Sequence, residues 1–356
     1  MTDLFSPLDL RGITVANRSW VSPMCQYSAV DGVVGDWHLV HLGSFATGGA
    51  GLVLAEATAV SPEGRISVNC PGLWNDEQVA AWRRVTDFAH TQSTPMGVQL
   101  AHAGRKGSTH APWATHPFAG VDEGGWLTVA PSAVPFEGYP EPHALSTGEI
   151  DRVVDDFVRA AQRALAAGFD VLEVYAAHGY LLHEFLSPLS NQRHDEYGGS
   201  FENRTRLVRR VVGALRGSLP DATPLFVRLS ATDWTEGGWS VDETVALAQI
   251  LGEEGVDLID VSSGGNVAGA TIPVGPGYQV AFAERVRREA HVAASAVGLI
   301  TEAHQADEII REGRADAVML ARASLRNPRW TLGAAEALGH VISWPHQFER
   351  ARTLHS

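Results

Sequence analysis

Five side chains that can hold or transfer a proton lie within ten positions of one another. They are Tyr175, His178, Tyr180, His183 and Glu184. They follow the apolar run 171–174, which only one Glu interrupts and which is typical of a buried strand. Polar groups are costly to bury without partners, so this crowding at a strand end indicates either a hydrogen-bonded cluster that fixes a long loop or an active site. For the set as a whole we favour an active site.

Two later stretches carry the features of an anion site. Residues 297–301 (VGLIT) and 318–328 (VMLARASLRNP) each end an apolar run where backbone N–H groups and the start of a helix can face a negative charge. Arg322 follows the second run, and its guanidinium offers a fixed charge with bidentate geometry for phosphate. The alternative is that Arg322 has a purely structural role.

An eightfold pattern of elements is available to position these groups, each unit having an apolar strand, a polar or glycine-rich exit and a helix. We expect strands at Trp20–Met24, Gly51–Ala57, Met96–Ala101, Phe169–Tyr175, Leu225–Ser230, Leu258–Ser262, Ala296–Ile300 and Ala317–Ala321. We expect helices near His38–Thr47, Asp76–Gln92, Thr147–Ala167, Phe201–Gly217, Val241–Glu254, Ala281–Glu289, Glu302–Glu312 and Pro328–Leu338. Eight such units predict a closed (β/α)8 TIM barrel of the α/β class. A doubly wound open sheet is the alternative, but no G-x-G-x-x-G turn supports it.

The other segments are expected to belong to the same single domain, which spans residues 1–356. Residues 5–18 alternate as a β-hairpin about Arg11-Gly12. Residues 104–143 have no period and several prolines, which predicts a rim loop or lid over the barrel mouth. Residues 182–200 form a second loop excursion, and residues 340–356 form a C-terminal tail.

In a barrel of this kind the chemistry lies at the carboxyl ends of the strands, because the loops that follow them converge there. The predicted strand exits carry most of the polar side chains, whereas the opposite ends supply mostly Gly, Asp, Pro and Ala. The exits deliver Cys25, Gln26, Tyr27, Glu56, Ala57, Gln99, His102, Arg105, Lys106, Tyr175, His178, Tyr180, Arg228, Ser262, Ser263, Gly264, Gly265, Gly298 and Arg322.

The composition argues against several classes of protein. A hydrophobic content of 45% and a charged content of 19% are ordinary for a soluble globular chain, and the net charge of −14 argues against binding to nucleic acid or an anionic membrane. No apolar run approaches the roughly 18 residues of a membrane span. The two cysteines, Cys25 and Cys70, suggest a reducing cytoplasm, and without an HExxH or paired CxxC motif we expect no metal in the site.

Several stretches resemble the old yellow enzyme family of FMN-dependent ene-reductases, and in particular its cysteine-containing, thermophilic-like subclass. They are SPMCQYS (22–28), EATAVSPEGR (56–65), QLAHAGRK (99–106), AAHGYLLHEFLSPLSN followed by DEYGGSFENR (176–204), FVRLSATDW (226–234), DVSSGG (260–265), AVGLIT (296–301) and GRADAVMLARASLRNP (313–328). The likeness runs nearly from end to end. It implies that NADPH or NADH reduces FMN, and that hydride then passes to the β-carbon of an activated alkene, such as an enone, enal, maleimide or nitroalkene, with protonation at the α-carbon.

The resemblance also implies roles for individual residues. The FMN-binding set would be Ser22, Pro23, Met24, Cys25, Ala57, Gln99, Arg228, Ser263, Gly264, Gly298, Ala321 and Arg322, with Arg228 beside flavin N1 and O2 and the last three around the phosphate. His178 would donate a hydrogen bond to the substrate carbonyl, Tyr180 would protonate the α-carbon, and Tyr27 would hold the carbonyl end. Cys25 would tune the flavin potential, and Cys70 has no assigned role.

Two features bear on the substrate site. The subclass usually has His where this chain has Tyr175, so the usual pair of imidazole donors becomes a phenol and an imidazole. Arg350, in SWPHQFERAR, matches a family arginine that reaches the active site of a neighbouring subunit in a homodimer or homotetramer. The alternative is that Arg350 belongs to a solvated basic tail.

Two other functions remain open from the sequence. A flavin-free, phosphate-binding barrel enzyme of the aldolase or epimerase type could use the same late-strand anion site, although no predicted strand carries the interior Lys that Schiff-base chemistry needs. A non-catalytic flavin-binding protein is the third possibility.

Overall fold

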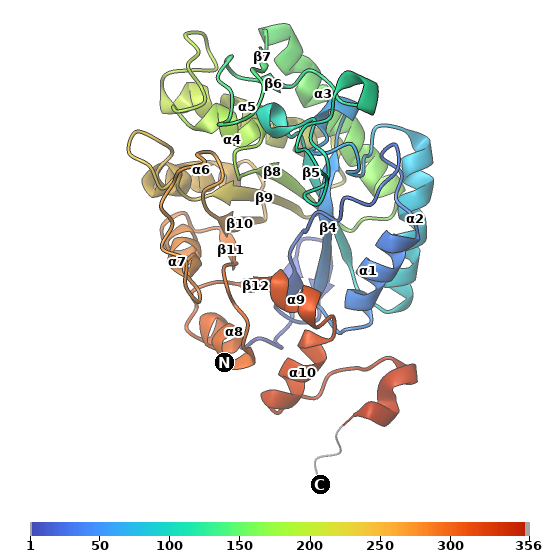
Figure 1. Cartoon of the computed structure of the whole chain (residues 1–356). Coiled ribbons are helices and arrows are strands. Elements are labelled where there is room, and N and C mark those ends of the chain that lie inside the picture. Colours follow the sequence, from blue (N-terminus) through green and yellow to red (C-terminus); the bar gives the residue numbers. More distant parts are fainter. Residues whose placement is uncertain (1, 353–356) are drawn as a thin grey trace.

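The computed structural model describes residues 2–352 and contains a closed barrel of eight parallel strands (Figure 1). The strands are β3 (Ser19–Val21), β4 (Leu52–Ala59), β5 (Met96–Ala101), β8 (Val171–Ala176), β9 (Leu225–Ser230), β10 (Leu258–Ser262), β11 (Ala293–Ala296) and β12 (Ala317–Leu320). Each strand pairs with the next in this order, and β12 closes the barrel by pairing with β3. The predicted TIM barrel is confirmed.

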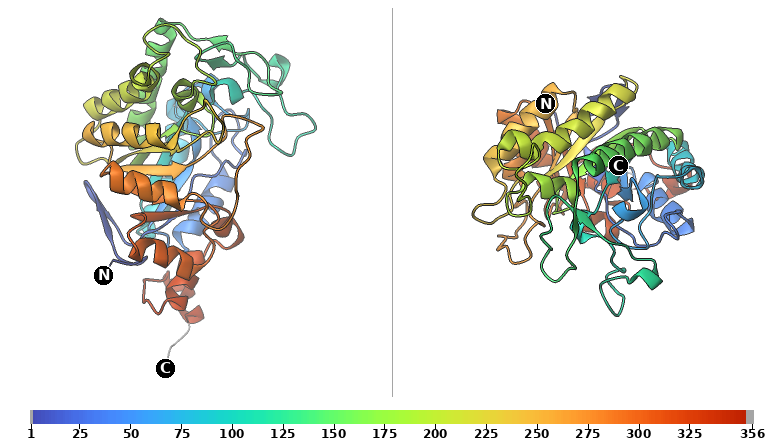
Figure 2. Two further views of the ribbon diagram at one scale, coloured as in Figure 1. Left: turned by 90° about the vertical axis from the view of Figure 1, so that its left-hand side faces the viewer. Right: turned by 90° about the horizontal axis from the view of Figure 1, so that it is seen from above.

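Helices form an outer layer around the strands (Figure 2). They are α1 (Asp36–Ala46), α2 (Asp76–Thr91), α3 (Thr147–Ala166), α5 (Phe201–Ser218), α6 (Val241–Glu253), α7 (Val280–Glu289), α8 (Ala303–Arg311) and α10 (Trp330–Ala337). Three of them begin with capping boxes, in which the side chains of Asn75, Ser146 and Ser240 accept from the backbone N–H three residues on. These local signals explain why the helix starts could be predicted closely.

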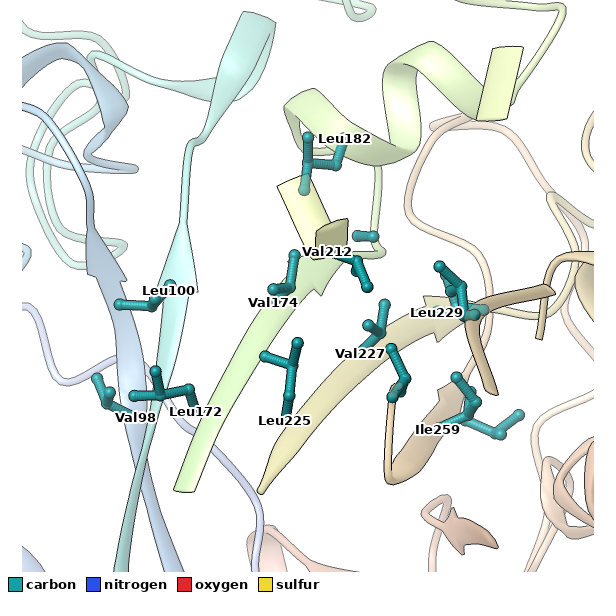
Figure 3. Close-up of a cluster of buried hydrophobic side chains, with 14 of the residues drawn as sticks. Val98, Leu100, Leu172, Val174, Leu182, Val212, Leu225, Val227, Leu229 and Ile259 are labelled. Carbon is teal, nitrogen blue, oxygen red and sulfur yellow. The ribbon is translucent and has the colours of Figure 1, made fainter. Parts of the chain in front are cut away.

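Strand residues alternate between the helix layer and the barrel interior. Figure 3 shows Val98, Leu100, Leu172, Val174, Leu225, Val227, Leu229 and Ile259 in one buried apolar cluster, with Leu182 and Val212 from the helix layer. The residues between them, such as Gln99, Glu173, Arg228 and Asp260, therefore point into the barrel. This alternation places polar groups inside an otherwise apolar sheet.

An apolar plug fills the amino-terminal end of the barrel. The predicted hairpin is present as β1 (Leu8–Leu10) and β2 (Ile13–Val15), and its residues pack with Trp20, Phe226 and Met319. The rings of Trp20 and Phe226 stack with centroids 5.9 Å apart. Because this end is closed, the interior polar groups are reached from the carboxyl ends of the strands.

The structure corrects two predicted elements and adds a third that was not predicted. The seventh strand is Ala293–Ala296 and not Ala296–Ile300, because Gly298 and Leu299 have φ angles of 121° and 51° that no strand can continue. The predicted loop 182–200 begins within a short helix, α4 (Leu181–Leu186). A further short helix, α9 (Arg322–Arg326), precedes α10.

The predicted rim segment 104–143 has little regular structure. It holds the short 3-10 helices η2 (Gly104–Lys106) and η3 (Val121–Glu123) and the strand β6 (Val129–Ala130), which pairs with β7 (His143–Ala144). Another 3-10 turn, η1 (Pro62–Gly64), follows β4. The tail ends in η4 (His346–Ala351), and its last four residues, 353–356, lie outside the described residues. Within residues 2–352, none of the helices has the length and apolar character that crossing a membrane requires.

Candidate active site

The interior of the barrel carries a layer of buried polar groups above the apolar plug. Gln99 Nε2 donates to Glu173 Oε1 across 2.7 Å, and the two residues are paired in register between β5 and β8. Arg228 Nε lies 3.1 Å from Asp260 Oδ2 on the neighbouring strand, and Asp260 Oδ1 accepts from Ser295 Oγ at 2.8 Å. All of these side chains are almost fully buried. Their charges therefore interact strongly with one another.

The charge balance of this layer sets the proton affinities. Burial, reinforced by Asp260, raises the pKa of Glu173 well above its ordinary value, which favours the protonated form of its carboxyl. Burial opposes the charge of Arg228, but Asp260 and Glu173 outweigh it and raise the pKa of its guanidinium. The layer thus holds one permanent cation.

The guanidinium of Arg228 is poised for a ligand. Within residues 2–352 it makes no hydrogen bond, because its contact with Asp260 is poorly aligned, and one oxygen of Glu173 also lacks a partner. Buried polar atoms without partners are rare in folded proteins, and they indicate that a bound group completes them. An electron-rich ring edge that carries hydrogen-bond acceptors would supply the hydrogen-bond partners that the guanidinium of Arg228 lacks.

His178 lies at the exit of β8 with both ring nitrogens engaged. Its Nδ1 is 2.8 Å from the phenol oxygen of Tyr175, and its Nε2 is 2.6 Å from Ser262 Oγ. The backbone is in the left-handed region at φ 58°, and its N–H donates to Ser230 Oγ. Burial, together with the charges of Arg228 and Lys106, holds the pKa of His178 well below its usual range. His178 is therefore a neutral donor with a fixed orientation.

Three aromatic side chains line the opening beside His178. The rings of Tyr175 and Tyr180 are 5.1 Å apart, and both pack with Tyr27 and Cys25 in one cluster. Burial raises the pKa of Tyr180 well above its ordinary value, so its phenol keeps its proton at neutral pH. The geometry thus brings the predicted donors Tyr27, Tyr175, His178 and Tyr180 together.

Lys106, the only lysine in the sequence, is largely buried next to these groups. Its Nζ donates to the backbone oxygens of His178 and Gly265 at 2.9 and 2.8 Å and lies 5.0 Å from the ring centroid of Tyr180. Burial lowers its pKa to about 8. The sequence placed Lys106 among the polar residues at the strand exits, and the structure places its ammonium group against the backbone of His178 and Gly265.

Cys70, to which the sequence analysis assigned no role, lies in the same site. Cys70 packs in one cluster with Cys25, Tyr175 and Tyr180, and its Sγ accepts from the N–H of Ser67 at 3.4 Å. The neighbouring thiol of Cys25 lowers the pKa of Cys70, and the thiol of Cys70 together with burial raises the pKa of Cys25. Asp260 and Glu173 were also not assigned, although a single carboxylate inside each apolar strand was a visible signal.

A cavity of about 170 Å³ lies between the ends of β9, β10, β11 and β12. Its walls include His178, Arg228, Ser262, Gly298, Ala321 and Arg322. Gly298 is required there, because a Cβ atom would approach Gln279 Nε2 to 2.9 Å and the φ angle is 121°. The backbone turn at Gly298 and the guanidinium of Arg322 suit a phosphate, so the cavity fits the anionic end of a ligand whose ring reaches Arg228.

The other predicted cofactor residues do not line this cavity. Ser22, Pro23, Met24 and Cys25 directly follow β3, and Glu56 fixes that segment by accepting from the N–H of Gln26 at 2.8 Å. Ala57 lies in β4 at a register shift, and Ser263 donates to Gln279 at 2.6 Å beside Gly264. Arg350 is exposed in η4, in a tail that extends away from the barrel within this chain (Figure 1).

Comparison with known proteins adds independent information. The sequence profile of the NADH:flavin oxidoreductase / NADH oxidase family matches residues 3–340. An NADPH dehydrogenase of Geobacillus sp. is 48% identical over 98% of this chain and 98% of its own length. An NADH:flavin oxidoreductase of Gibberella zeae is 46% identical over 98% of this chain and 89% of its own length.

Solved structures of flavin-family proteins also resemble this chain over most of its length. Morphinone reductase has a TM-score of 0.79 at 30% identity, with 96% of this chain and 91% of the other covered. An old yellow enzyme homologue from Zymomonas mobilis has a TM-score of 0.77 at 26% identity, with 96% and 94% covered. The same architecture therefore extends over nearly the whole of each chain.

Proposed function

This chain belongs to the NADH:flavin oxidoreductase family, also called the old yellow enzyme family, and from that premise we propose that it is an ene-reductase for activated alkenes. It is an oxidoreductase that uses FMN with NAD(P)H as the reductant. The proposed substrates are enones, enals, maleimides and nitroalkenes. Membership of the family disfavours the aldolase-type alternative, and the described strands carry no lysine that could form a Schiff base.

The residues present fit FMN. Arg228 places a guanidinium inside the barrel that has an ion pair with Asp260 but no hydrogen bond within residues 2–352, and Gly298 and Arg322 line a cavity suited to a phosphate. Bound FMN supplies hydride transfer, first from the nicotinamide nucleotide and then to the alkene. The proposed holding set is Ser22, Pro23, Met24, Cys25, Ala57, Gln99, Arg228, Ser263, Gly264, Gly298, Ala321 and Arg322.

His178 is the proposed donor to the carbonyl oxygen of the substrate. A neutral imidazole with one N–H can donate there, and charge that develops on the oxygen strengthens the bond in the transition state. The contacts with Tyr175 and Ser262 fix the orientation of the ring before a substrate arrives, and the carbonyl oxygen then takes the place of one of these two partners. Tyr27 is proposed to hold the same end of the substrate.

Tyr180 is the proposed general acid for the α-carbon. Its phenol is protonated at neutral pH, and its ring lies beside Tyr175 at the same opening. The ammonium group of Lys106 over the ring favours the developing phenolate, because a cation stabilises negative charge nearby in a low-dielectric site. A tyrosine placed this way can deliver a proton without being charged beforehand.

The observation that carries the proposal is that the guanidinium of Arg228, the neutral His178 and the anion cavity meet at one end of the barrel. Within residues 2–352 that guanidinium has an ion pair with Asp260 but no hydrogen bond. The test is anaerobic stopped-flow spectroscopy of the FMN-loaded protein. NADPH or NADH should bleach the flavin, and an enone should restore its colour. A protein that binds FMN but is not reoxidised by any enone, maleimide or nitroalkene would be a flavin carrier instead.

The same proposal extends to the setting of the enzyme. We propose a homodimer or homotetramer in which Arg350 reaches the site of a neighbouring subunit, and a cytoplasmic location. Sedimentation of the FMN-loaded protein measures the first, and a single monomeric species at working concentration would rule it out.

A further inference from the structure

A second cluster of polar side chains lies on the rim segment, away from the barrel interior. Among the described residues, His110, His116 and Glu123 present ring nitrogen and carboxylate oxygen atoms that all lie within 4.8 Å of one another. His110 Nε2 is 3.3 Å from Glu123 Oε2, and His116 Nε2 is 3.4 Å from Glu123 Oε1. These two distances run to the two different oxygens of one carboxylate. Ligands held tetrahedrally at the ~2.1 Å typical of zinc lie about 3.4 Å apart, so each imidazole is at a separation from the carboxylate that suits a shared cation.

The backbone holds the three side chains in this arrangement. Thr109 and Phe118 form an antiparallel bridge, and the N–H of His110 donates to the oxygen of Pro117 at 2.9 Å. The N–H of Gly120 donates to Glu123 Oε2 at 2.9 Å, which fixes the carboxylate against the turn. Backbone hydrogen bonds at the base of loop 110–117 and the turn at Gly120 thus hold the three side chains in place.

The hydrogen bonds of His116 leave one contact unexplained. Its Nδ1 lies 3.1 Å from the backbone oxygen of Phe118, and a carbonyl can only accept, so Nδ1 carries the proton. In the neutral ring, Nε2 then presents a bare lone pair toward a carboxylate oxygen 3.4 Å away. Two acceptors facing each other repel. Either a second proton on His116 or a cation between the two atoms must relieve this contact.

We propose that His110, His116 and Glu123 form a site for a divalent transition-metal cation of the zinc class. Two imidazoles and one carboxylate are a ligand set that zinc accepts, with water in the fourth position. The hydrogen bond from Nδ1 of His116 to a backbone carbonyl is the outer contact that orients metal-binding histidines. The side chain of His116 is 53% exposed, so an ion can enter from solvent.

The site is connected to the substrate opening through one aromatic contact. Trp113 lies in the turn between His110 and His116, and its ring meets that of Tyr27 edge-on with centroids 5.7 Å apart. A bound cation fixes this turn and therefore the position of Trp113 over Tyr27. The cation would then hold the rim segment rigid beside the substrate opening, and it would take no part in the FMN chemistry.

The test is isothermal titration of zinc chloride into tag-free, FMN-loaded protein that has been freed of metals by a chelator. One saturable site per chain is expected, and magnesium should not compete, since it prefers all-oxygen sites. His116→Ala and Glu123→Gln should each weaken zinc binding at least about 10-fold, the lower end of the effect of disturbing a metal site. Gln retains the acceptor for Gly120, so the turn survives the second substitution.

The matched control is His143→Ala. His143 also pairs with a carboxylate, Glu149 at 3.0 Å, and its side chain is 47% exposed, but the described residues provide no third ligand there. The His143→Ala substitution should leave zinc binding unchanged. The absence of a saturable site, or equal weakening by His143→Ala, overturns the proposal and assigns the contact to a protonated His116.

Discussion

The phenol oxygen of Tyr175 lies 2.8 Å from Nδ1 of His178, so the residue that replaces the expected second imidazole binds the first one. The imidazole is held on its other side by Ser262 at 2.6 Å. A substrate carbonyl that accepts from His178 must therefore displace one of these two partners. Tyr175 supports His178, and it does not stand beside it as an equivalent donor.

Tyr175→His is expected to widen activity toward small cyclic enones, because a second imidazole can donate to the same carbonyl. One additional hydrogen bond is worth about 0.5–1.5 kcal/mol, or roughly 2- to 12-fold in kcat/KM. Steady-state kinetics over a series of ring sizes measures the effect. Tyr175→Phe is the control, since it removes the contact to His178 without adding a donor and should lower kcat/KM. Identical kinetics in the wild type and both variants would show that Tyr175 does not belong to the substrate site.

Tyr180→Phe is expected to slow alkene reduction by about 10²–10⁴, the usual contribution of a positioned general acid. Reduction of the flavin by NAD(P)H should be unchanged, because that step needs no proton from Tyr180. Anaerobic stopped-flow measurement of the two half-reactions separates these rates. Equal losses in both halves would point to a packing role.

Arg228→Lys is expected to weaken FMN retention, because an ammonium keeps the charge but loses the fork of the guanidinium. Arg228→Met should weaken it further and also destabilise the fold by about 3–5 kcal/mol, since Asp260 loses its buried partner. Flavin absorbance after gel filtration and denaturant unfolding of the FMN-free protein measure the two effects. Full FMN retention in both variants would contradict the proposed contact.

Alkene reduction is expected to fall as the pH rises through about 8, where Lys106 loses its charge over Tyr180. Lys106→Met should abolish this step in the pH profile of the oxidative half-reaction.

The same titration of Lys106 changes folding stability in the opposite direction, so that stability rises as the pH rises. Burial lowers the pKa of Lys106 from 10.5 in the unfolded chain to about 8, so its unfavourable contribution is full below pH 8 and disappears between pH 8 and 10.5. Denaturant unfolding of wild type and variant across this range checks it.

Truncation after Phe348 is expected to impair substrate binding and oligomer formation if Arg350 enters a neighbouring site. Arg350→Ala should raise KM while leaving the oligomer intact, because only the side chain is lost. Arg352→Ala is the control two residues further on. Kinetics and assembly that survive the truncation would assign Arg350 to a solvated tail.

Local signals in the sequence were enough for the barrel itself. Capping residues such as Ser146 and Ser240 begin their helices where expected, and the apolar runs around Glu173 and Asp260 became strands. Apolar sequence gave the wrong position for one strand, because the backbone conformation of two residues in the run does not fit a strand. The run Ala296–Ile300 was predicted as the seventh strand, but Gly298 and Leu299 turn away from the sheet and line the cavity instead.

The sequence by itself determined the eightfold repeat and the strand ends at which the polar groups gather, because both follow from period and from local capping. Which polar groups meet across the barrel was decided only by strand register and closure. The pairing of Arg228 with Asp260, the thiol contact of Cys25 with Cys70 and the contact of Tyr175 with His178 all depend on that geometry. The rim cluster of His110, His116 and Glu123 had no recognisable spacing, since an irregular loop and the short 3-10 helix η3 bring those side chains together.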